Sequence, residues 1–273
     1  MSFALLFILQ DALDLPRARR EARELLQDAH RLLDLGQYEK AVDAHRRGRD
    51  LERRARQALE SAVAKALPGL DDDLYETRER ASRALLALGP AALPAFDALL
   101  RCELTAETRA RLQDVVRRLK EVEEDADGRL RLWAEGARAS SEYEAERWSA
   151  GQAAGRPDTP PGGDRPTAWA SKEADAGEEW LELRFGLELR PSKIRVHETY
   201  NPGALVKAEA LAADGTWTTL WKGKAAAREG DPWRTLEIAP GAPATRTIRL
   251  TLDSGAVPGW NEIDAVELIG EVP

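Results

Sequence analysis

The chain has 273 residues, of which 43% are apolar and 32% are charged, and its formal net charge is −8. This composition excludes wholesale disorder, because enough apolar side chains are present to bury a core, and the length suits about two domains. The acidic balance argues against nucleic acid as a partner, since nucleic-acid binding usually needs a basic face.

The first twelve residues, "MSFALLFILQDA", contain an apolar run that leaves two interpretations open. The run has the length of a signal-peptide h-region, and on that interpretation residues 1–12 are a short signal peptide of an exported protein, periplasmic or extracellular. No lysine or arginine precedes the run, so the alternative is the start of a first helix in a cytoplasmic protein. The run is too short to span a bilayer, and we expect no membrane span elsewhere.

The period of the apolar residues predicts a helical domain over residues 13–124. Two apolar stripes, from Ala18 to Leu33 and from Ala41 to Ala62, flank Gly36 and predict an antiparallel helical hairpin. Small residues dominate the seam, so we expect the two helices to approach each other closely. The stretch "LLDLGQYEKAVDAHRRGRDL" resembles the middle of a tetratricopeptide repeat. Only one such unit is present, and a single repeat makes no solenoid groove.

Shorter helices are predicted after the break at Pro68-Gly69. An apolar stripe from Leu74 to Leu88 forms one expected buried face, and Thr105 is placed to cap a further helix. This segment resembles a HEAT-type helical pair with one extra helix. Cys102 is the only cysteine, which excludes an intramolecular disulfide and a cysteine-based zinc site. We expect it to be a small buried hydrophobic residue.

The pattern changes after the acidic run at residues 121–128. Apolar and polar residues now alternate, which predicts strands in "EEWLELRF", "KIRVHE" and "TIRLTL". Proline and glycine exclude a strand from the polar loop at residues 151–167. Short strands between turns predict an antiparallel sandwich or barrel over residues 129–273.

Three stretches of this half follow one another in the order of a known family: "ARASSEYEAERWSAGQAAG", "TAWASKEADAGEEWLELRF" and "GWNEIDAVELIG". Together they resemble the discoidin family, the galactose-binding-like jelly roll also found at the C-terminus of coagulation factors V and VIII. The resemblance implies a β-sandwich jelly roll, mostly extracellular in this family, that binds glycans, lipid head groups or proteins through loops at one end. It also implies that Trp169 and Trp180, each in or beside a matching strand, belong to the core. The chain departs from many members in lacking a disulfide, and no sugar-binding set of arginine and histidine can be placed on its rim.

The resemblance also implies a structural Ca²⁺ near the first long loop. Calcium takes oxygen ligands, from carboxylates and loop carbonyls together. The loop offers Asp158, Thr159 and Asp164, and the last strand offers Glu267. The alternative is a loop held by turns and water alone.

Ligand contacts are expected at the loop tips, where aromatic side chains can stack on sugar rings. The segment "HETYNPGALVK" projects Glu198, Tyr200 and Asn201 between two strands, and Trp260 stands at the mouth of the last strand. The alternatives are an ordinary turn for that segment and packing at the end of the sandwich for Trp260. Other aromatic rim candidates are Trp217, Trp221 and Trp233.

No catalytic motif is present: GxSxG, HExxH, a P-loop and GxGxxG are all missing, and the three histidines are scattered. We therefore predict that the protein is not an enzyme. The leading hypothesis is a non-catalytic binding protein, whose β-sandwich recognises carbohydrate or another cell-envelope ligand and whose helices are the scaffold. The competing hypothesis is a structural adaptor that binds a protein partner through its helical hairpins.

Overall fold

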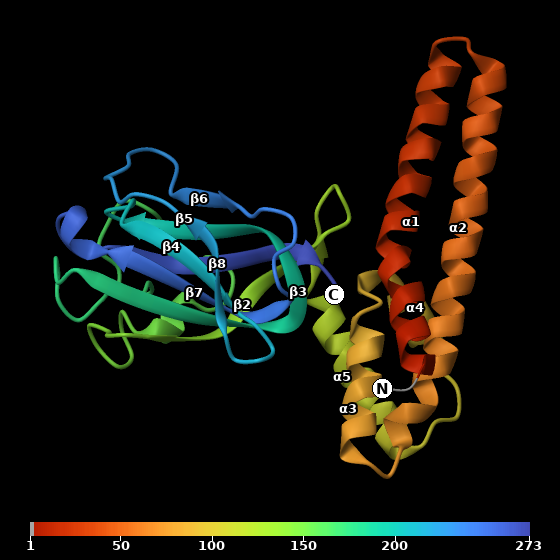
Figure 1. Ribbon diagram of the computed structural model, residues 1–273, viewed down its shortest axis with the longest axis horizontal. Helices are drawn as coiled ribbons and strands as arrows, with labels where there is room; N and C mark the ends of the chain where they lie inside the picture. The colour runs from red at the N-terminus through yellow and green to blue at the C-terminus, as the bar shows by residue number, and fades with distance from the viewer. Residues whose placement is uncertain (1–2) are drawn as a thin grey trace. The chain divides into compact units, whose positions relative to one another are not determined.

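The structure is a computed structural model that describes residues 3–273, with side chains from residue 18 onward. The chain divides into two compact units, residues 1–130 and residues 131–273. The first unit is helical and the second is built on antiparallel strands, so the predicted order of fold classes is confirmed (Figure 1). Residues 3–12, for which a signal peptide was one interpretation, are helical, while Met1 and Ser2 lie outside the described residues. Export stays a prediction.

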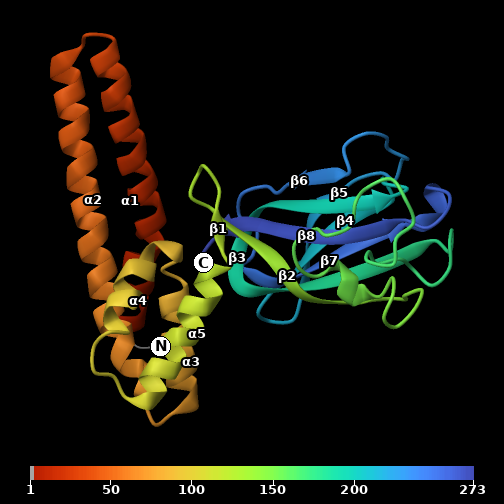
Figure 2. The same cartoon turned by 180° about the vertical axis from the view of Figure 1, so that it is seen from behind.

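In the described part of the helical unit, from residue 3 onward, there are two long helices and three shorter ones. Figures 1 and 2 show α1 and α2 as a hairpin, with α3, α4 and α5 gathered around the end of the hairpin opposite its turn. The helices are α1 (Phe3–Asp34), α2 (Tyr38–Ala66), α3 (Tyr75–Leu86), α4 (Leu93–Leu99) and α5 (Ala106–Lys120). Short 3₁₀ turns at Leu67–Asp71 and Pro90–Ala92 connect them.

Small residues form the seam of the hairpin, as predicted. A Cβ atom on Gly48 would lie 2.9 Å from Leu26 Cγ and 3.2 Å from the carbonyl oxygen of Ala22. A larger residue at this position would therefore push the helices apart. The other buried seam residues are Ala22, Ala29, Ala41, Ala44, Ala55 and Ala62.

The shorter helices confirm one sequence prediction and correct two. Thr105 caps α5, since its hydroxyl accepts a hydrogen bond from Thr108 N at 3.2 Å. The prediction for Leu74 was wrong, because Leu74 precedes α3 and is 67% exposed. The prediction for Cys102 was also wrong: the thiol is exposed, in the turn that follows α4.

Among residues 3–273, eight strands make up the sheet, in the order β1-β2-β8-β3-β7-β4-β5, with β6 paired to β3 and a further pairing of β2 with β3. The strands are β1 (Glu123–Glu124), β2 (Leu130–Ala139), β3 (Glu178–Tyr200), β4 (Leu205–Leu211), β5 (Trp217–Lys222), β6 (Trp233–Glu237), β7 (Thr245–Asp253) and β8 (Glu262–Glu271). Strand β3 pairs antiparallel with β2, β6, β7 and β8, and β4 pairs antiparallel with β5 and β7, as predicted.

The long strand β3 joins the two layers of the sandwich. Its first half pairs with β7, where Leu183 lies opposite Ile248, and its second half pairs with β8, where Ile194 lies opposite Leu268. The strands predicted separately in "EEWLELRF" and "KIRVHE" are thus parts of the one strand β3. Pro191 is tolerated between them because the strand changes partners there, and register shifts mark both sides of this region.

The core of the sandwich lies between the two layers. Trp169 is completely buried, as predicted. Trp180 does not join it: the side chain is half-buried on the opposite side of β3 from Leu181, beneath the guanidinium of Arg249. The other large core side chains are Leu181, Leu183, Phe185, Leu189, Ile194, Val196, Leu205, Ile248, Leu250, Ile263, Val266 and Leu268. In the part of the chain that the structure describes, no helix combines the length and apolarity that a membrane span needs.

Candidate binding site

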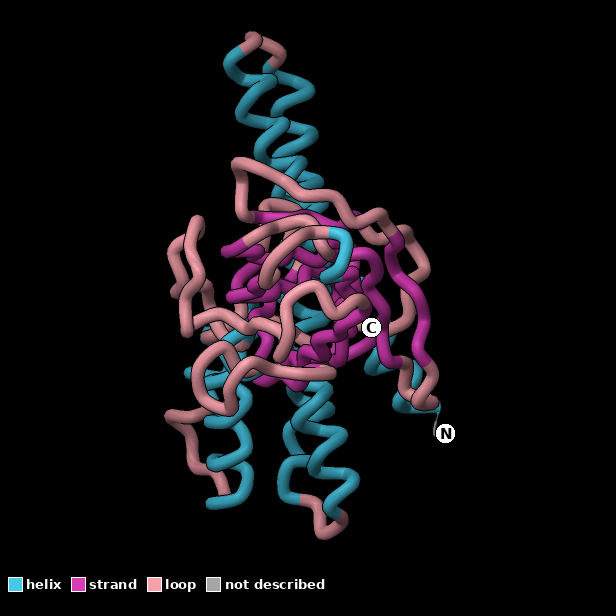
Figure 3. Tube along the Cα trace, turned by 90° about the vertical axis from the view of Figure 1, so that its left-hand side faces the viewer, coloured by secondary structure: helices cyan, strands magenta, loops and turns pink. Residues whose placement is uncertain are grey.

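A long loop, residues 140–177, connects β2 to β3 at one end of the sandwich, where Figure 3 shows loops in front of the strand ends. Its buried anchor is Trp169, which exchanges two backbone hydrogen bonds with Ile263 at the start of β8, at 2.8 and 3.1 Å. Its indole N–H donates to Ser141 O at 3.0 Å, across the loop. These contacts place the loop beside residues 257–261, which lead into the last strand.

Three aromatic side chains meet where these two segments come together. Tyr143 contacts Trp148 and Trp260 edge-on, with ring centroids 5.3 and 5.7 Å apart. Tyr143 is 46% exposed, whereas both tryptophans are half-buried. We call Tyr143, Trp148 and Trp260 the aromatic cluster. It presents a partly exposed apolar surface at the loop end of the sandwich.

Trp148 is held in a conformation that few side chains adopt. Its φ angle is 51°, in the left-handed region, which costs free energy for a large non-glycine residue. Two contacts hold it there: the indole N–H donates to Asp164 Oδ1 at 2.8 Å, and the Arg147 guanidinium lies 4.9 Å from the ring centroid. Residues in such strained conformations concentrate at functional sites.

Two buried carboxylates of β8 tie the loop to the sheet. Asp264 accepts hydrogen bonds from the Thr159 amide at 3.2 Å, and its other oxygen lies 2.8 Å from His197 Nδ1. Glu262 accepts a hydrogen bond from the Arg165 amide at 3.2 Å. The hydroxyls of Thr159 and Thr167, 2.7 Å apart, join the two halves of the loop. The loop geometry is therefore set by side chains of the last strand.

The Glu262 carboxyl lies in an unusual environment. It is 1% exposed, and this burial, reinforced by the neighbouring Asp164 carboxylate, raises the pKa of Glu262 to about 8. The side chain is therefore mostly protonated at neutral pH. Among the described residues three buried side-chain oxygens have no hydrogen-bond partner: Thr199 Oγ1, Asn261 Oδ1 and Glu262 Oε1. Thr199 is at the end of β3, Asn261 directly precedes β8 and Glu262 begins it.

The structure does not bring the predicted calcium ligands together. Asp158 and Thr159 lie beside Asp264, and Asp164 lies beside Trp148. Glu267 is fully buried elsewhere on β8. Its two carboxylate oxygens bind Arg131 at 2.6 Å and Arg195 at 2.9 Å. Within the described residues no group of three or more histidine, cysteine, aspartate or glutamate side chains is arranged to hold a metal ion. The four predicted residues do not fit calcium as one site, and calcium binding stays a prediction.

The predicted ligand residues have separate roles in the structure. Glu198 is buried, and it accepts hydrogen bonds from Gly203 N at 2.8 Å and Arg228 Nη1 at 2.9 Å. This carboxylate therefore fixes its own turn and the segment that precedes β6. Asn201, with φ 41°, donates from Nδ2 to Trp260 O at 2.9 Å, so it positions Trp260. Tyr200 is the half-buried last residue of β3. Of the four, Trp260 belongs to the aromatic cluster.

The other tryptophans predicted as rim candidates lie under arginine side chains. The guanidinium groups of Arg249, Arg234 and Arg195 lie 4.1, 5.0 and 4.4 Å from the ring centroids of Trp217, Trp221 and Trp233. Each guanidinium covers one face of its ring, as that of Arg147 does at Trp148. Sequence reasoning missed Tyr143 and Trp148. The available signal was two aromatic residues inside the otherwise polar stretch "SSEYEAERW".

A family model described as pappalysin-1, SD scarf domain, C-terminal, matches residues 123–272, which is more than half of the chain. The chain belongs to this family. The scarf domain comprises the antiparallel unit, the loop at residues 140–177 and the aromatic cluster.

Among curated proteins, the scarf-domain chain is similar to F-box/LRR-repeat protein 4 of Bos taurus, with 31% identity over 108 residues. The match covers 34% of this chain and 17% of that protein, so the chain spans about a sixth of its relative's length.

Solved structures resemble about half of the chain at low identity. Chitosan-binding module 1 of a chitosanase/glucanase from Paenibacillus sp. IK-5 is 16% identical, with a TM-score of 0.39, and the match covers 50% of this chain and 96% of that one. The family 32 carbohydrate-binding module of Clostridium perfringens NanJ, solved with galactose, is 19% identical with a TM-score of 0.37, covering 51% and 98%. Allantoicase of Saccharomyces cerevisiae is 17% identical with a TM-score of 0.38, covering 51% and 43%.

Proposed function

We propose that the scarf domain is a non-catalytic carbohydrate-binding module that binds its ligand at the aromatic cluster. The observation that carries the proposal is the exposed ring of Tyr143, supported on two sides by Trp148 and Trp260. The C–H face of a sugar ring is apolar and packs against an aromatic face, while its hydroxyls need polar partners beside it.

Hydrogen-bond donors and acceptors surround the aromatic cluster. Glu144, Glu146 and Arg147 are exposed on the same loop as Tyr143. The charged groups can donate to and accept from sugar hydroxyls, and Arg147 already lies over Trp148. The cluster is also rigid, because Trp148 is bound to Asp164 and the Trp260 indole N–H donates to Ser171 O at 3.1 Å. A rigid aromatic platform loses little conformational entropy when a ligand binds.

A glycan array probed with the full chain tests this proposal, with the variant Tyr143→Ala beside it. We expect the wild type to bind at least one glycan class and the variant to lose this binding, because the variant lacks the exposed ring. The variant should still fold, because the Tyr143 side chain makes none of the hydrogen bonds described for the fold. Tyr75→Ala, which removes another exposed tyrosine from the helical unit, is the matched control. Equal binding by the wild type and the Tyr143 variant would place the ligand elsewhere.

A second function, a structural adaptor, has its own supporting observation. The turn of the α1–α2 hairpin carries four exposed large apolar side chains: Leu33, Leu35, Tyr38 and Val42. Such a cluster at the end of a hairpin is a surface that a protein partner can cover. Affinity capture from the native host with the wild type and with Tyr38→Asp/Val42→Asp tests it. A stoichiometric partner lost in the variant supports the adaptor function, and an unchanged partner set opposes it.

A further inference from the structure

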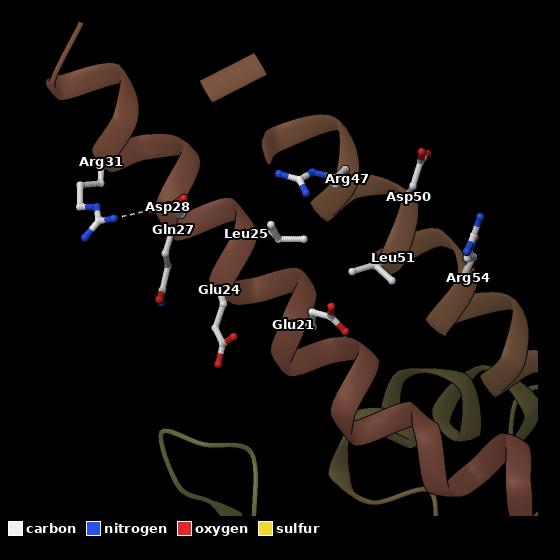
Figure 4. A pocket seen from close by; sticks show the side chains of 10 residues that line it. All are labelled: Glu21, Glu24, Leu25, Gln27, Asp28, Arg31, Arg47, Asp50, Leu51 and Arg54. Carbon is white, nitrogen blue, oxygen red and sulfur yellow. Dashed lines mark hydrogen bonds and ion pairs between the residues drawn. The ribbon is translucent and has the colours of Figure 1, made fainter. Parts of the chain in front are cut away.

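The α1–α2 hairpin has a groove along one side, with a volume of about 910 Å³. Figure 4 shows Leu25 of α1 and Leu51 of α2 pointing toward one another between the helices. The two walls of the groove differ in charge. The α1 wall carries Glu21, Glu24, Asp28 and Arg31, and the α2 wall carries Arg47, Asp50 and Arg54.

The hairpin leaves several leucine side chains beside the groove incompletely covered. Among the described side chains of α1 and α2, the buried ones are alanine, glycine and Val63, whereas Leu25, Leu26, Leu32 and Leu51 remain half-buried. Full burial of a leucine stabilises a fold by roughly 1.5–3 kcal/mol, far more than burial of an alanine methyl group. Isolated helices depend on tertiary packing for most of their stability. A further layer of helices over the groove would supply this packing.

We propose that the groove is the interface of a homodimer, in which two hairpins pack face to face as an antiparallel four-helix bundle. A two-fold axis parallel to the helices does not shift residues along the bundle, so each residue lies at the same height along the axis in both copies. Helix α1 of one copy then faces α2 of the second copy, which runs in the opposite direction. Up-and-down bundles of four helices use this arrangement.

The register of the hairpin brings opposite charges together across this interface. Gly48 lies beside Ala22 and Leu26, which sets the relative heights of the two helices. At 1.5 Å per residue, Arg47 of the second copy then lies within about one turn of Asp28. By the same count, Arg54 of the second copy lies within about one turn of Glu21. Because the interface is two-fold symmetric, each contact occurs twice. Leu25 and Leu51 of both copies, four leucines in all, meet at its centre.

The ion pairs already present within each helix do not compete strongly with these contacts. Asp28 pairs with Arg31 at 2.8 Å, and Arg47 pairs with Asp43 at 3.1 Å. Both pairs are exposed, and exposed pairs contribute about 0–1 kcal/mol.

Asp50 also lines the groove, at the height of Glu21 and Glu24 of the second copy, and it pairs with Arg53 of its own helix at 2.6 Å. The α1 wall carries three acidic residues and one basic residue, and the α2 wall carries two basic residues and one acidic residue, so the two walls are opposite in net charge. This opposition and the shared apolar surface favour a second copy of this chain over an unrelated helix.

Sedimentation equilibrium of the full chain tests the dimer with two charge-reversal variants. One is Glu21→Arg/Asp28→Arg and the other is Arg47→Glu/Arg54→Glu. We expect the wild type to be a dimer and each variant alone to dissociate, with a dissociation constant at least 10-fold higher. A mixture of the two variants should form a heterodimer, because the basic hairpin then faces the acidic one. The matched control, Arg46→Glu/Arg56→Glu, changes charge on the same helix outside the groove lining and should stay dimeric.

A variant carrying all four reversals keeps the test decisive if either pair prevents folding, because it restores opposite charges within the hairpin and between copies. We expect this fourfold variant to be a dimer. A monomeric wild type would overturn the proposal. So would a dimer that neither charge-reversal pair weakens, or two folded, monomeric variants that do not associate when mixed. Capture of an unrelated helical protein in the groove by a monomeric chain would also overturn it.

Discussion

Tyr143 lies edge-on against Trp260, with ring centroids 5.7 Å apart, although the two residues come from the first loop and the last turn of the scarf domain. Their contact depends on the loop at residues 140–177 being held at the start of β8. The carboxylate of Asp264 and the backbone of Trp169 provide this attachment. Changes that release the loop should therefore affect both stability and binding.

Asp264→Ala should lower the free energy of unfolding of the scarf domain by about 3 kcal/mol. The variant leaves the Thr159 amide and the buried His197 ring without their shared acceptor, and unpaired buried groups cost about 1–3 kcal/mol each. Urea unfolding measures the loss, and hydrogen exchange should be faster at Thr159. Asp253→Ala, at an exposed aspartate of β7, is the control. An equally small effect for both variants would show that Asp264 does not anchor the loop.

The stability of the scarf domain should fall as pH rises from about 4.5 to about 8. Burial raises the pKa of Glu262 from its ordinary value of 4.5 to about 8, so in this window the folded chain binds a proton that the unfolded chain has released. The stabilisation that comes from proton binding at Glu262 is fully present below pH 4.5 and has been lost above pH 8. Each pKa unit corresponds to about 1.36 kcal/mol, so the loss should be several kcal/mol.

Glu262→Gln should remove this part of the pH dependence, because glutamine keeps the neutral shape without titrating. Unfolding free energies of both proteins, measured across the window, give the comparison. We expect the wild-type curve to fall relative to that of the variant as pH rises. Parallel curves would contradict the buried, protonated state of Glu262.

Glu267→Gln should lower the free energy of unfolding by about 1–3 kcal/mol, with or without added calcium. The wild-type carboxylate binds Arg131 and Arg195, and a neutral amide weakens both ion pairs. If Glu267 were instead a calcium ligand, calcium would raise the melting temperature of the wild type and leave that of the variant unchanged. Thermal unfolding with calcium and with a chelator distinguishes the two roles.

Gly48→Leu should destabilise the helical hairpin by about 1–3 kcal/mol, despite the higher helix propensity of leucine. Even a Cβ atom at this position would lie 2.9 Å from Leu26 Cγ, so the helices must separate to admit a larger side chain. Arg46→Leu, at an exposed position of the same helix, is the control. Chemical denaturation followed by helix circular dichroism measures both, and equal stability would show that the seam tolerates a wider spacing.

Much of the fold follows from local patterns. The small-residue seam predicted the close approach at Gly48, the alternation predicted the strands, and the hydroxyl of Thr105 predicted a helix start. These features depend on neighbours close in sequence or on the period of a single element. The predictions for Leu74 and Cys102 were wrong because an apolar residue at a helix end or in a turn is covered only if a distant segment lies over it.

The site was less predictable, because its side chains are organised by contacts between segments far apart in the chain. Glu198 was predicted at a binding tip, but Arg228 and Gly203 bind both its oxygens. Glu267 was predicted to face the loop, but β8 carries it to two arginines. No local pattern reports which carboxylate receives an arginine. The location of Trp260 at the loop end, by contrast, could be predicted from the turn before the last strand.

The most direct measurement of the central claim is a ¹⁵N NMR titration that follows the indole N–H signals of the tryptophans. The full chain is titrated with the glycan that binds most strongly on the array. The account predicts shifts for Trp148 and Trp260, smaller or no shifts for the buried Trp169, and loss of all shifts in Tyr143→Ala. Shifts confined to Trp217, Trp221 or Trp233 would contradict it, because the sugar would then bind an outer face of the sandwich instead of the aromatic cluster.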